Sequence, residues 1–295
     1  MKGELKYAMP ATLTPLRYPG GKTKYTDLFV DIIAANDLDN CTFVEVFAGG
    51  SGAALKLLLK GHVKEVFLND LDGAIYSFWK VVKERPQDLI DLIRHTRVSV
   101  AEWKRQKAIF EGKDTSDSLT LAFATFFLNR CNHSGILGAR PIGGMSQDGK
   151  YRISSRFNKD TSIAKIEAIA THADNITVFN MGGADFLAHL KRQYPNQKFL
   201  VYLDPPYYQK GPVLYLNHFT YEDHRALRDC IVQCPFPWVL SYDNHDDIIE
   251  LYARYGLALY RNQIRHTVAG NENAEELIIS RLNMPCHLER FSENR

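Results

Sequence analysis

The chain has 295 residues, of which 45% are hydrophobic and 24% are charged, and its formal net charge is +2. This is the composition of a globular protein with one large domain or two modest ones, and the slight basic excess permits a nucleic-acid partner without requiring one. A membrane span is excluded because no apolar run reaches about 18 residues, and the sequence shows no repeats and no low-complexity tract.

The cysteines indicate a reducing compartment and no metal site. They are odd in number and scattered, and no signal peptide precedes them, so we expect a cytoplasmic protein. Cys131 with His133 and Cys230 with Cys234 are isolated pairs that lack a second pair at zinc-ligand spacing, and we therefore predict no metal. The cysteines are Cys41, Cys131, Cys230, Cys234 and Cys286.

Residues 1–15 are predicted to be a loose arm, and an aromatic-Pro-Gly-Gly-Lys corner at residues 18–22 precedes a predicted helix at 26–35. Residues 21–23 resemble the end of a phosphate-binding P-loop. That motif requires glycine where this chain has Leu16, and no strand precedes it, so an NTPase is disfavoured. The corner can instead place one ring and one ammonium group against a small ligand.

A strand at 42–47, a glycine turn at 48–52 and a helix through Leu59 form the first unit of a nucleotide-binding α/β sheet. Glycines let the backbone approach a ligand at a helix N-terminus. A second strand at 65–69 ends before Asp70, twenty residues beyond Gly50, where an acid commonly takes ribose hydroxyls. A dinucleotide fingerprint is incomplete, because Leu55 stands in place of its last glycine.

From residue 74 to about 160 the pattern becomes helical, with predicted helices at 75–83, 87–95, 101–110 and 119–128. Residues 129–160 are then polar, with six basic and two acidic side chains. A long irregular segment inside a compact protein is usually functional, and its arginines suit contacts to phosphates and base edges.

Strand and helix patterns then alternate again, and the strands are bounded by turn residues. A loop at 209–220 could close over a substrate, and a second loop is expected at 266–274. The predicted strands are 176–180, 199–203, 238–242, 256–263 and 276–281, and the predicted helices are 221–233 and 246–255.

The strand at 199–203 ends in Asp204-Pro205-Pro206-Tyr207, the most distinctive stretch of the chain. Proline fixes φ near −65° and removes a backbone donor, so this cluster is rigid. Tyr207 offers a ring face and Asp204 an acceptor, at the edge where open α/β sheets bind ligands. The cluster suits a planar amine that must be stacked and gripped.

Seven segments in this order resemble the Dam-like DNA adenine methyltransferases, the α-group of amino-methyltransferases. They match two cofactor motifs, an acidic motif, the asparagine-arginine pair of the recognition domain, an acid-aromatic pair, the catalytic motif and the final strand. The segments are 17–22, 43–53, 68–70, 129–130, 185–186, 204–207 and 276–279.

The resemblance implies an α/β fold with a Rossmann-like S-adenosylmethionine-dependent methyltransferase sheet and an inserted, mainly helical target-recognition domain. Residues 1–73 and 161–295 would form the catalytic domain, and residues 74–160 the recognition domain. The implied activity is transfer of a methyl group from S-adenosyl-L-methionine to the N6 amine of adenine in DNA, after the base is flipped out.

Site residues follow from the same resemblance. The catalytic residues would be Asp204, Pro205, Pro206 and Tyr207. The cofactor would be bound by Tyr18, Lys22, Glu45, Phe47, Gly49, Gly50, Asp70, Asp185, Phe186 and Asp204. DNA would be bound by Asn129, Arg130, Asn132, Arg140, Arg152 and Arg156.

The implied partners are double-stranded DNA and a candidate restriction endonuclease. We expect the protein to be a monomer or a weak dimer and to lie at the nucleoid in the cytoplasm. Methylation of the cytosine N4 amine and of adenine in RNA remain open, since both are amines on flipped bases. Methylation at cytosine carbon is disfavoured because Pro285-Cys286 lies beyond the last strand. A non-enzymatic binding module would leave residues 204–207 unexplained. The segment 131–157 departs from members that methylate GATC, and the target sequence is therefore not predicted.

Overall fold

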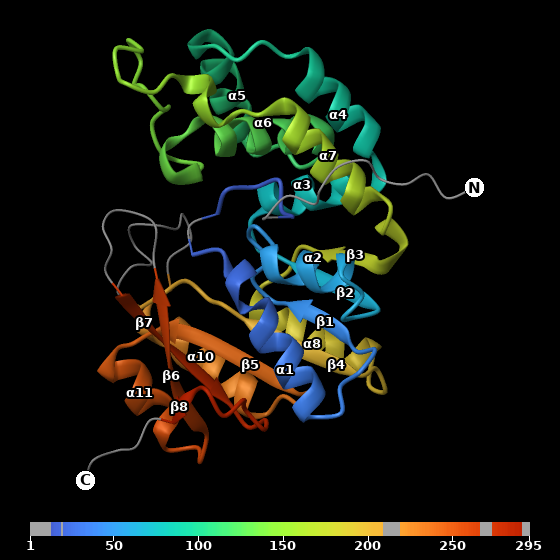
Figure 1. Cartoon of the computed structure of the whole chain (residues 1–295), viewed down its shortest axis with the longest axis vertical. Coiled ribbons are helices and arrows are strands. Elements are labelled where there is room, and N and C mark those ends of the chain that lie inside the picture. Colours follow the sequence, from blue (N-terminus) through green and yellow to red (C-terminus); the bar gives the residue numbers. More distant parts are fainter. Residues whose placement is uncertain (1–12, 19, 209–218, 266–272, 291–295) are drawn as a thin grey trace. The chain divides into compact units, whose positions relative to one another are not determined.

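A computed structural model describes residues 13–18, 20–208, 219–265 and 273–290 (Figure 1). The chain divides into two compact units. The helical unit consists of Met1–Thr26, Gly50–Lys60 and Ser77–Asp174, and the sheet unit of Asp27–Gly49, Gly61–Tyr76 and Asn175–Arg295. The N-terminal segment and the helix after the glycine turn thus belong with the helices. The domain boundaries at residues 73 and 160 stay a prediction.

The sheet unit holds eight strands in the order β3-β2-β1-β4-β5-β7-β6-β8. Strands β1 to β5 are parallel to one another, whereas β7 runs antiparallel between β5 and β6, and β8 runs antiparallel to β6. The strand order reverses between β1 and β4, and open sheets bind ligands beyond the carboxyl ends at such a point. The strands are β1 (Thr42–Glu45), β2 (Glu65–Asn69), β3 (Ile176–Phe179), β4 (Phe199–Leu203), β5 (Trp238–Asp243), β6 (Ala258–Arg265), β7 (Asn273–Ser280) and β8 (Glu289–Arg290).

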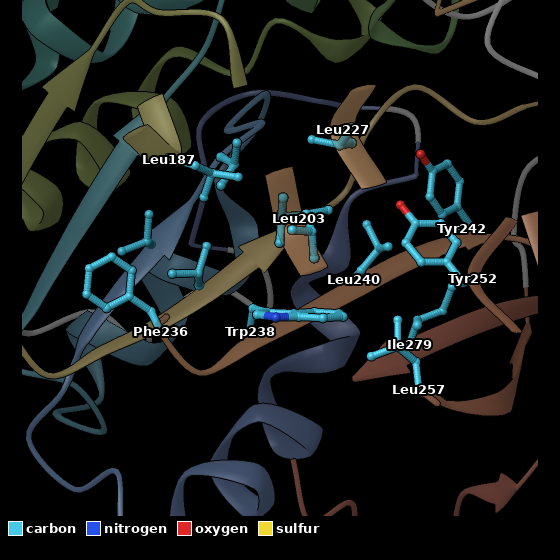
Figure 2. Close-up of a cluster of buried hydrophobic side chains, with 14 of the residues drawn as sticks. Leu187, Leu203, Leu227, Phe236, Trp238, Leu240, Tyr242, Tyr252, Leu257 and Ile279 are labelled. Carbon is cyan, nitrogen blue, oxygen red and sulfur yellow. The ribbon is translucent and has the colours of Figure 1, made fainter. Parts of the chain in front are cut away.

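Helices cover both faces of this sheet, because alternate strand residues point to opposite sides. On one face α8 (Gly183–Gln193), α10 (Tyr221–Val232) and α11 (Asp246–Ala253) supply Leu187, Leu227 and Tyr252 to a buried cluster with Leu203 and Leu240 (Figure 2).

On the other face α1 (Thr26–Ala35) places Phe29 against the sheet. The ring of Phe29 lies 4.9 Å from Phe43 of β1 and 4.7 Å from Tyr202 of β4, both edge to face. Such aromatic pairs add stability beyond the area that they bury. The central strands β1 and β4 are therefore buried on both faces, which explains their unbroken apolar runs.

The helical unit is built around α6, whose residues from Leu121 to Leu128 are all buried. Phe126 lies 5.4 Å from Phe157, which follows the basic segment. The helices are α2 (Gly52–Leu59), α3 (Gly73–Glu84), α4 (Pro86–His95), α5 (Val100–Gly112), α6 (Ser118–Cys131) and α7 (Lys159–Ala170), with short 3-10 turns η1 (Lys22–Tyr25), η2 (His133–Gly135), η3 (Ile153–Arg156) and η4 (Ala173–Asn175).

Polar caps set where several of these helices begin. Asp117 accepts a hydrogen bond from the Thr120 amide at α6, and Asn158 accepts one from the Thr161 amide at α7. These caps satisfy amides that have no partner within the helix. No helix among the described residues is long and apolar enough to cross a membrane.

Most predicted elements are confirmed within two residues, with a few differences. Helices α7 and α8 and strand β8 were not predicted individually. Residues 273 and 274, expected in a loop, extend β7, because they pair with Arg265 and Ile264 of β6. The remainder of that loop, 266–272, and residues 209–218 of the other loop lie outside the described residues.

Candidate active site

Asp204 follows the last residue of β4 directly, at the carboxyl edge of the sheet. Its carboxylate Oδ1 accepts a hydrogen bond of 2.8 Å from the hydroxyl of Ser241 on β5. That hydroxyl is in turn 2.7 Å from the phenol of Tyr202. The predicted catalytic acid is thus held from within the sheet by two buried hydroxyl groups, neither of which the sequence identified.

The residues after Asp204 are fixed by the neighbouring strands as well. The Tyr207 hydroxyl donates a 2.6 Å hydrogen bond to Oε1 of Glu276 on β7, and the Tyr208 amide donates one of 2.9 Å to Asp243 at the end of β5. Bonds to carboxylates are the stronger class of hydrogen bond. Pro205 is buried and Pro206 half-buried, so the segment is rigid on both sides of its proline pair.

The glycine turn and the acid after β2 are connected directly. The Gly49 amide donates to Oδ2 of Asp70 at 2.8 Å, and the Asp72 amide donates to Oδ1 at 2.9 Å. Gly49 has φ of 45°, a left-handed value that glycine adopts without steric cost. The sequence predicted both residues, and the structure brings them into contact.

Burial raises the pKa of Asp70 to about 6, despite the two backbone amides that favour its charged form. The carboxyl group therefore titrates close to neutral pH. A carboxylate that has lost its water is stabilised more strongly by hydrogen bonds from hydroxyl donors than an exposed carboxylate is.

Asn69 organises the loops at this edge. Its amide nitrogen donates to the carbonyls of Val46 at 2.9 Å and Met181 at 3.0 Å, and its amide oxygen accepts from the Met181 backbone at 3.0 Å. One buried side chain thereby connects the loops after β1, β2 and β3. In the sequence, Asn69 was notable only as the neighbour of Asp70, and its position at the end of an apolar strand was the available signal.

The remaining predicted cofactor residues of the sheet unit differ in exposure. Glu45 is buried at the end of β1, and the half-buried Phe47 ring lies 5.9 Å from Phe219. Asp185 is exposed in the first turn of α8. Phe186 is fully buried, with its ring 4.9 Å from Phe179. Its observed contacts are thus those of a core residue that anchors α8.

Three predicted cofactor residues belong to the helical unit. Lys22 is buried and donates a 3.0 Å hydrogen bond to the Gly20 carbonyl. A Cβ atom on Gly50 would lie 2.8 Å from Cβ of Tyr18, so only glycine allows this close approach. The chain passes from the sheet unit into the helical unit at the Gly49–Gly50 peptide bond.

The asparagines predicted to bind DNA are buried and engaged within the helical unit. Asn129 accepts from the Arg17 amide at 2.7 Å and donates to the carbonyls of Arg17 and Gly135. Asn132 donates to two backbone carbonyls and accepts from the Trp103 ring nitrogen. Both side chains therefore hold the N-terminal segment and the turn after α6 in place.

The predicted arginines are more accessible. Arg140, Arg152 and Arg156 are exposed, and Arg130 is partly buried. Burial, with Arg17 and Arg156 nearby, lowers the pKa of Arg130 to about 10, and burial beside Arg130 lowers the pKa of Lys165 to about 8. Cations gathered in this way attract an anion. The sequence did not identify Arg17 or Lys165 as members of this group.

Within the described part of the chain, no three His, Cys, Asp or Glu side chains gather at a spacing that could hold a metal ion.

Comparison with known families decides among the candidate activities. The sequence model of the D12 class of N6 adenine-specific DNA methyltransferases matches residues 18–267, which is most of the chain. The chain belongs to this family. The D12 methyltransferase described here therefore acts on the N6 amine of adenine in DNA, and nothing in the family favours the cytosine-N4 or RNA alternatives.

Two curated relatives agree with this assignment. The D12 methyltransferase is 24% identical over 201 residues to the type II methyltransferase M1.LlaDCHI of Lactococcus lactis subsp. cremoris. The aligned region covers 65% of this chain and 67% of the relative. It is 22% identical over 205 residues to the type II methyltransferase M.MjaIII of Methanocaldococcus jannaschii, and this aligned region covers 65% of this chain and 68% of the relative.

Solved structures resemble it only distantly. The rRNA methyltransferase aviRa from Streptomyces viridochromogenes has a TM-score of 0.41 and 12% identity, and the match covers 95% of this chain and 90% of that one. The methyltransferase domain of bacterial CtHen1 has a TM-score of 0.36 and 9% identity, over 88% and 99% of the two chains. The family and the sheet order together give a Rossmann-like methyltransferase fold, which implies S-adenosyl-L-methionine as the methyl donor.

Proposed function

We propose that the D12 methyltransferase flips an adenine out of double-stranded DNA and methylates its N6 amine at the segment from Asp204 to Tyr207. The observation that carries this proposal is the anchoring of Asp204 at the carboxyl end of β4, where Ser241 holds one carboxylate oxygen at 2.8 Å. A fixed carboxylate accepts a hydrogen bond from an amine and favours a geometry in which the nitrogen lone pair leaves conjugation with the ring.

The groups around Asp204 support the other requirements of the reaction. The Pro205 carbonyl next to it accepts a second hydrogen bond from the amine, and neither proline nitrogen competes as a donor. The Tyr207 ring, tethered through its hydroxyl to Glu276, offers a face for stacking the flipped base. S-adenosyl-L-methionine, when bound, would supply an electrophilic methyl group. The bond from the amine nitrogen to this methyl forms as the sulfur–methyl bond breaks, S-adenosyl-L-homocysteine leaves, and the methylated amine loses one proton to water, without a covalent enzyme intermediate.

The chain's own groups fit this cofactor. Asp70 offers carboxylate acceptors for ribose hydroxyls, beside the Gly49 backbone that it holds. Replacing Gly50 by any larger residue would force a Cβ atom against Tyr18. We assign Gly49, Gly50, Tyr18 and Lys22 to the methionine moiety, and Asp185 to the adenine amine of the cofactor.

Cofactor affinity is expected to tighten by about tenfold between pH 5 and pH 7, because Asp70 with a pKa of about 6 is mostly protonated at pH 5. The ionised form is the better acceptor for hydroxyl donors, so affinity rises as pH rises through 6. Calorimetry with S-adenosyl-L-methionine at both pH values measures the change. Asp70→Asn corrects for titration of the ligand itself, and an equal pH dependence in the variant would contradict the role of Asp70.

We assign DNA recognition to residues 74–160, as the sequence predicted. The exposed Arg140, Arg152 and Arg156 are the side chains available for phosphates or base edges. Because Asn129 and Asn132 are buried and bonded to the backbone, we assign them to shaping the recognition surface.

Alanine at Arg140, Arg152 or Arg156 is expected to weaken DNA binding without changing cofactor affinity. Each lost phosphate contact should flatten the log–log salt dependence by about one unit, whereas a lost base contact should relax sequence preference. Binding to matched and mismatched duplexes at several salt concentrations separates the two. Arg85, which is exposed and paired with Asp88, is the matched control. If all three variants keep the wild-type slope and preference, the recognition surface lies elsewhere.

Base flipping is tested once the target site is known. Long-read sequencing of a host that expresses the enzyme reports the modified base and its context. A duplex with 2-aminopurine in place of the target adenine should then brighten on binding, because the base leaves the DNA stack. Tyr207→Ala should brighten it further, because the flipped base then loses the tyrosine ring that stacks on it and quenches it. Binding with no fluorescence change at any position of the site would contradict flipping.

The type II methyltransferases among the relatives support a cognate restriction endonuclease as a further partner. A DNA substrate also supports a location at the nucleoid in the cytoplasm, and we expect a monomer or weak dimer. Co-purification from the native host and light scattering of the pure protein test these points.

A further inference from the structure

We propose that Ser241 is a positioning residue for Asp204, and that Tyr202 orients Ser241, so that a one-way chain of hydrogen bonds from the sheet holds the carboxylate. The inference rests on the proposed function of Asp204 and adds two residues that belong to none of the seven motifs.

The direction of the chain follows from the number of protons. An ionised carboxylate only accepts hydrogen bonds, so Ser241 must donate to Asp204 across their 2.8 Å contact. A serine hydroxyl has one proton, and Ser241 donates that proton in its hydrogen bond to Asp204. The 2.7 Å contact between Ser241 and Tyr202 must therefore be a donation from the tyrosine.

Strand register explains why these three residues meet. Tyr202 of β4 pairs with Val239 of β5, so their side chains lie on the same face of the sheet. Because side chains alternate along a strand, Asp204 and Ser241 lie two positions on and share that face. The opposite face is the one on which Leu203 and Leu240 pack.

Burial makes the chain rigid and effective. Ser241 is 0% exposed and Tyr202 is 2% exposed, and the Tyr202 ring packs 4.7 Å from Phe29. Hydrogen bonds are stronger in this low-dielectric setting and polarise one another. The terminal torsion of an aspartate is broad, so packing alone would not fix the plane of the Asp204 carboxylate. The Ser241 donor fixes it.

A carboxylate has about four lone-pair sites on two oxygens, and the bond from Ser241 to Oδ1 takes one of them. Ser241 thus acts on the orientation of the amine through Asp204, and it need not touch DNA or cofactor. The expected consequence is an effect on kcat with little effect on substrate affinity.

The test is a double-mutant cycle on Ser241 and Tyr202, with Ser280 as the matched control. Ser280 is also a fully buried serine of the sheet, but it donates to the Trp238 carbonyl. Ser241→Ala is expected to lower kcat by about ten- to a hundredfold, since small misplacements of catalytic groups cost this much. The DNA KM and the S-adenosyl-L-methionine Kd should stay within about twofold of wild type. Ser280→Ala should leave kcat unchanged.

Tyr202→Phe should lower kcat by a smaller factor, because Ser241 keeps its proton but loses its orientation. The double variant should have the kcat of Ser241→Ala alone, since the phenol acts only through the serine.

Two results would overturn the inference: wild-type kcat in Ser241→Ala, or an equal loss of kcat in Ser241→Ala and Ser280→Ala. Asp204→Ala, measured in parallel, separates this failure from that of the proposed function. If Asp204→Ala is inactive while Ser241→Ala is normal, only the positioning role fails. If Asp204→Ala is active, the proposed catalytic role fails first.

Discussion

Replacement of Asp204 by alanine is expected to lower methyl transfer to DNA by about a hundredfold or more, the largest effect of any single substitution considered. In the proposed mechanism the carboxylate is the group held against the target amine, and removing a preorganised group of this kind typically costs on the order of 10²–10³ in kcat. Single-turnover transfer of labelled methyl groups to unmethylated DNA measures the loss.

The fold should survive this change. Asp204 is only partly buried and lies beyond the end of β4, so thermal unfolding and DNA binding should stay close to wild type. Asp204→Asn is the matched control, since it keeps the size of the side chain and an oxygen that can accept from Ser241, but replaces an acceptor by a donor. Activity of Asp204→Ala within tenfold of wild type would exclude the catalytic assignment.

Replacement of Asp70 by alanine is expected to weaken binding of S-adenosyl-L-methionine by about 1.5–3 kcal/mol, the usual value of hydrogen bonds to a charged group. This corresponds to an increase in Kd of roughly ten- to 150-fold. The variant loses the proposed acceptor for ribose hydroxyls and also the acceptor for the Gly49 amide. Both losses act on the cofactor side of the site.

Calorimetry on Asp70→Ala and Asp70→Asn separates the two contributions. The asparagine variant keeps a carbonyl oxygen for one backbone amide and should lose less affinity than the alanine variant. DNA affinity in the absence of cofactor should not change in either variant. An unchanged Kd for S-adenosyl-L-methionine in Asp70→Ala would mean that Asp70 does not contact the ribose.

Local patterns predicted the elements that their own residues determine. The unbroken apolar run of β4 indicated a strand buried on both faces, and the structure buries all five of its residues. The glycine turn and Asp70 were also predicted, because strand ends and glycines mark the binding edge of such sheets. The order of the motifs then indicated the family, which the comparison confirmed.

Contacts between distant segments could not be predicted in this way. Ser241 lies 37 positions from Asp204, and Glu276 lies 69 positions from Tyr207. Each meets its partner because strands far apart in sequence lie side by side in the sheet. The only local signal was a polar residue in or beside an apolar strand, which by itself fits a solvent-facing position equally well.

Burial also changes the role that we assign to residues identified by a motif. Asn129 and Phe186 match family motifs, yet both are buried, with their amide or ring engaged within their own unit. A motif match shows which residue type occupies a position. The contacts of that residue in the structure indicate which role it has. For these two residues the contacts support holding a surface in place.

The most direct test of the account is the identity of the methylated nucleoside. Purified enzyme is incubated with methyl-labelled S-adenosyl-L-methionine and, in separate reactions, with unmethylated double-stranded DNA and with RNA, and the products are hydrolysed to nucleosides and separated. The account predicts label in N6-methyladenine from DNA alone, and its loss with Asp204→Ala. Label in N4-methylcytosine, or in adenine from RNA at a comparable rate, would contradict it.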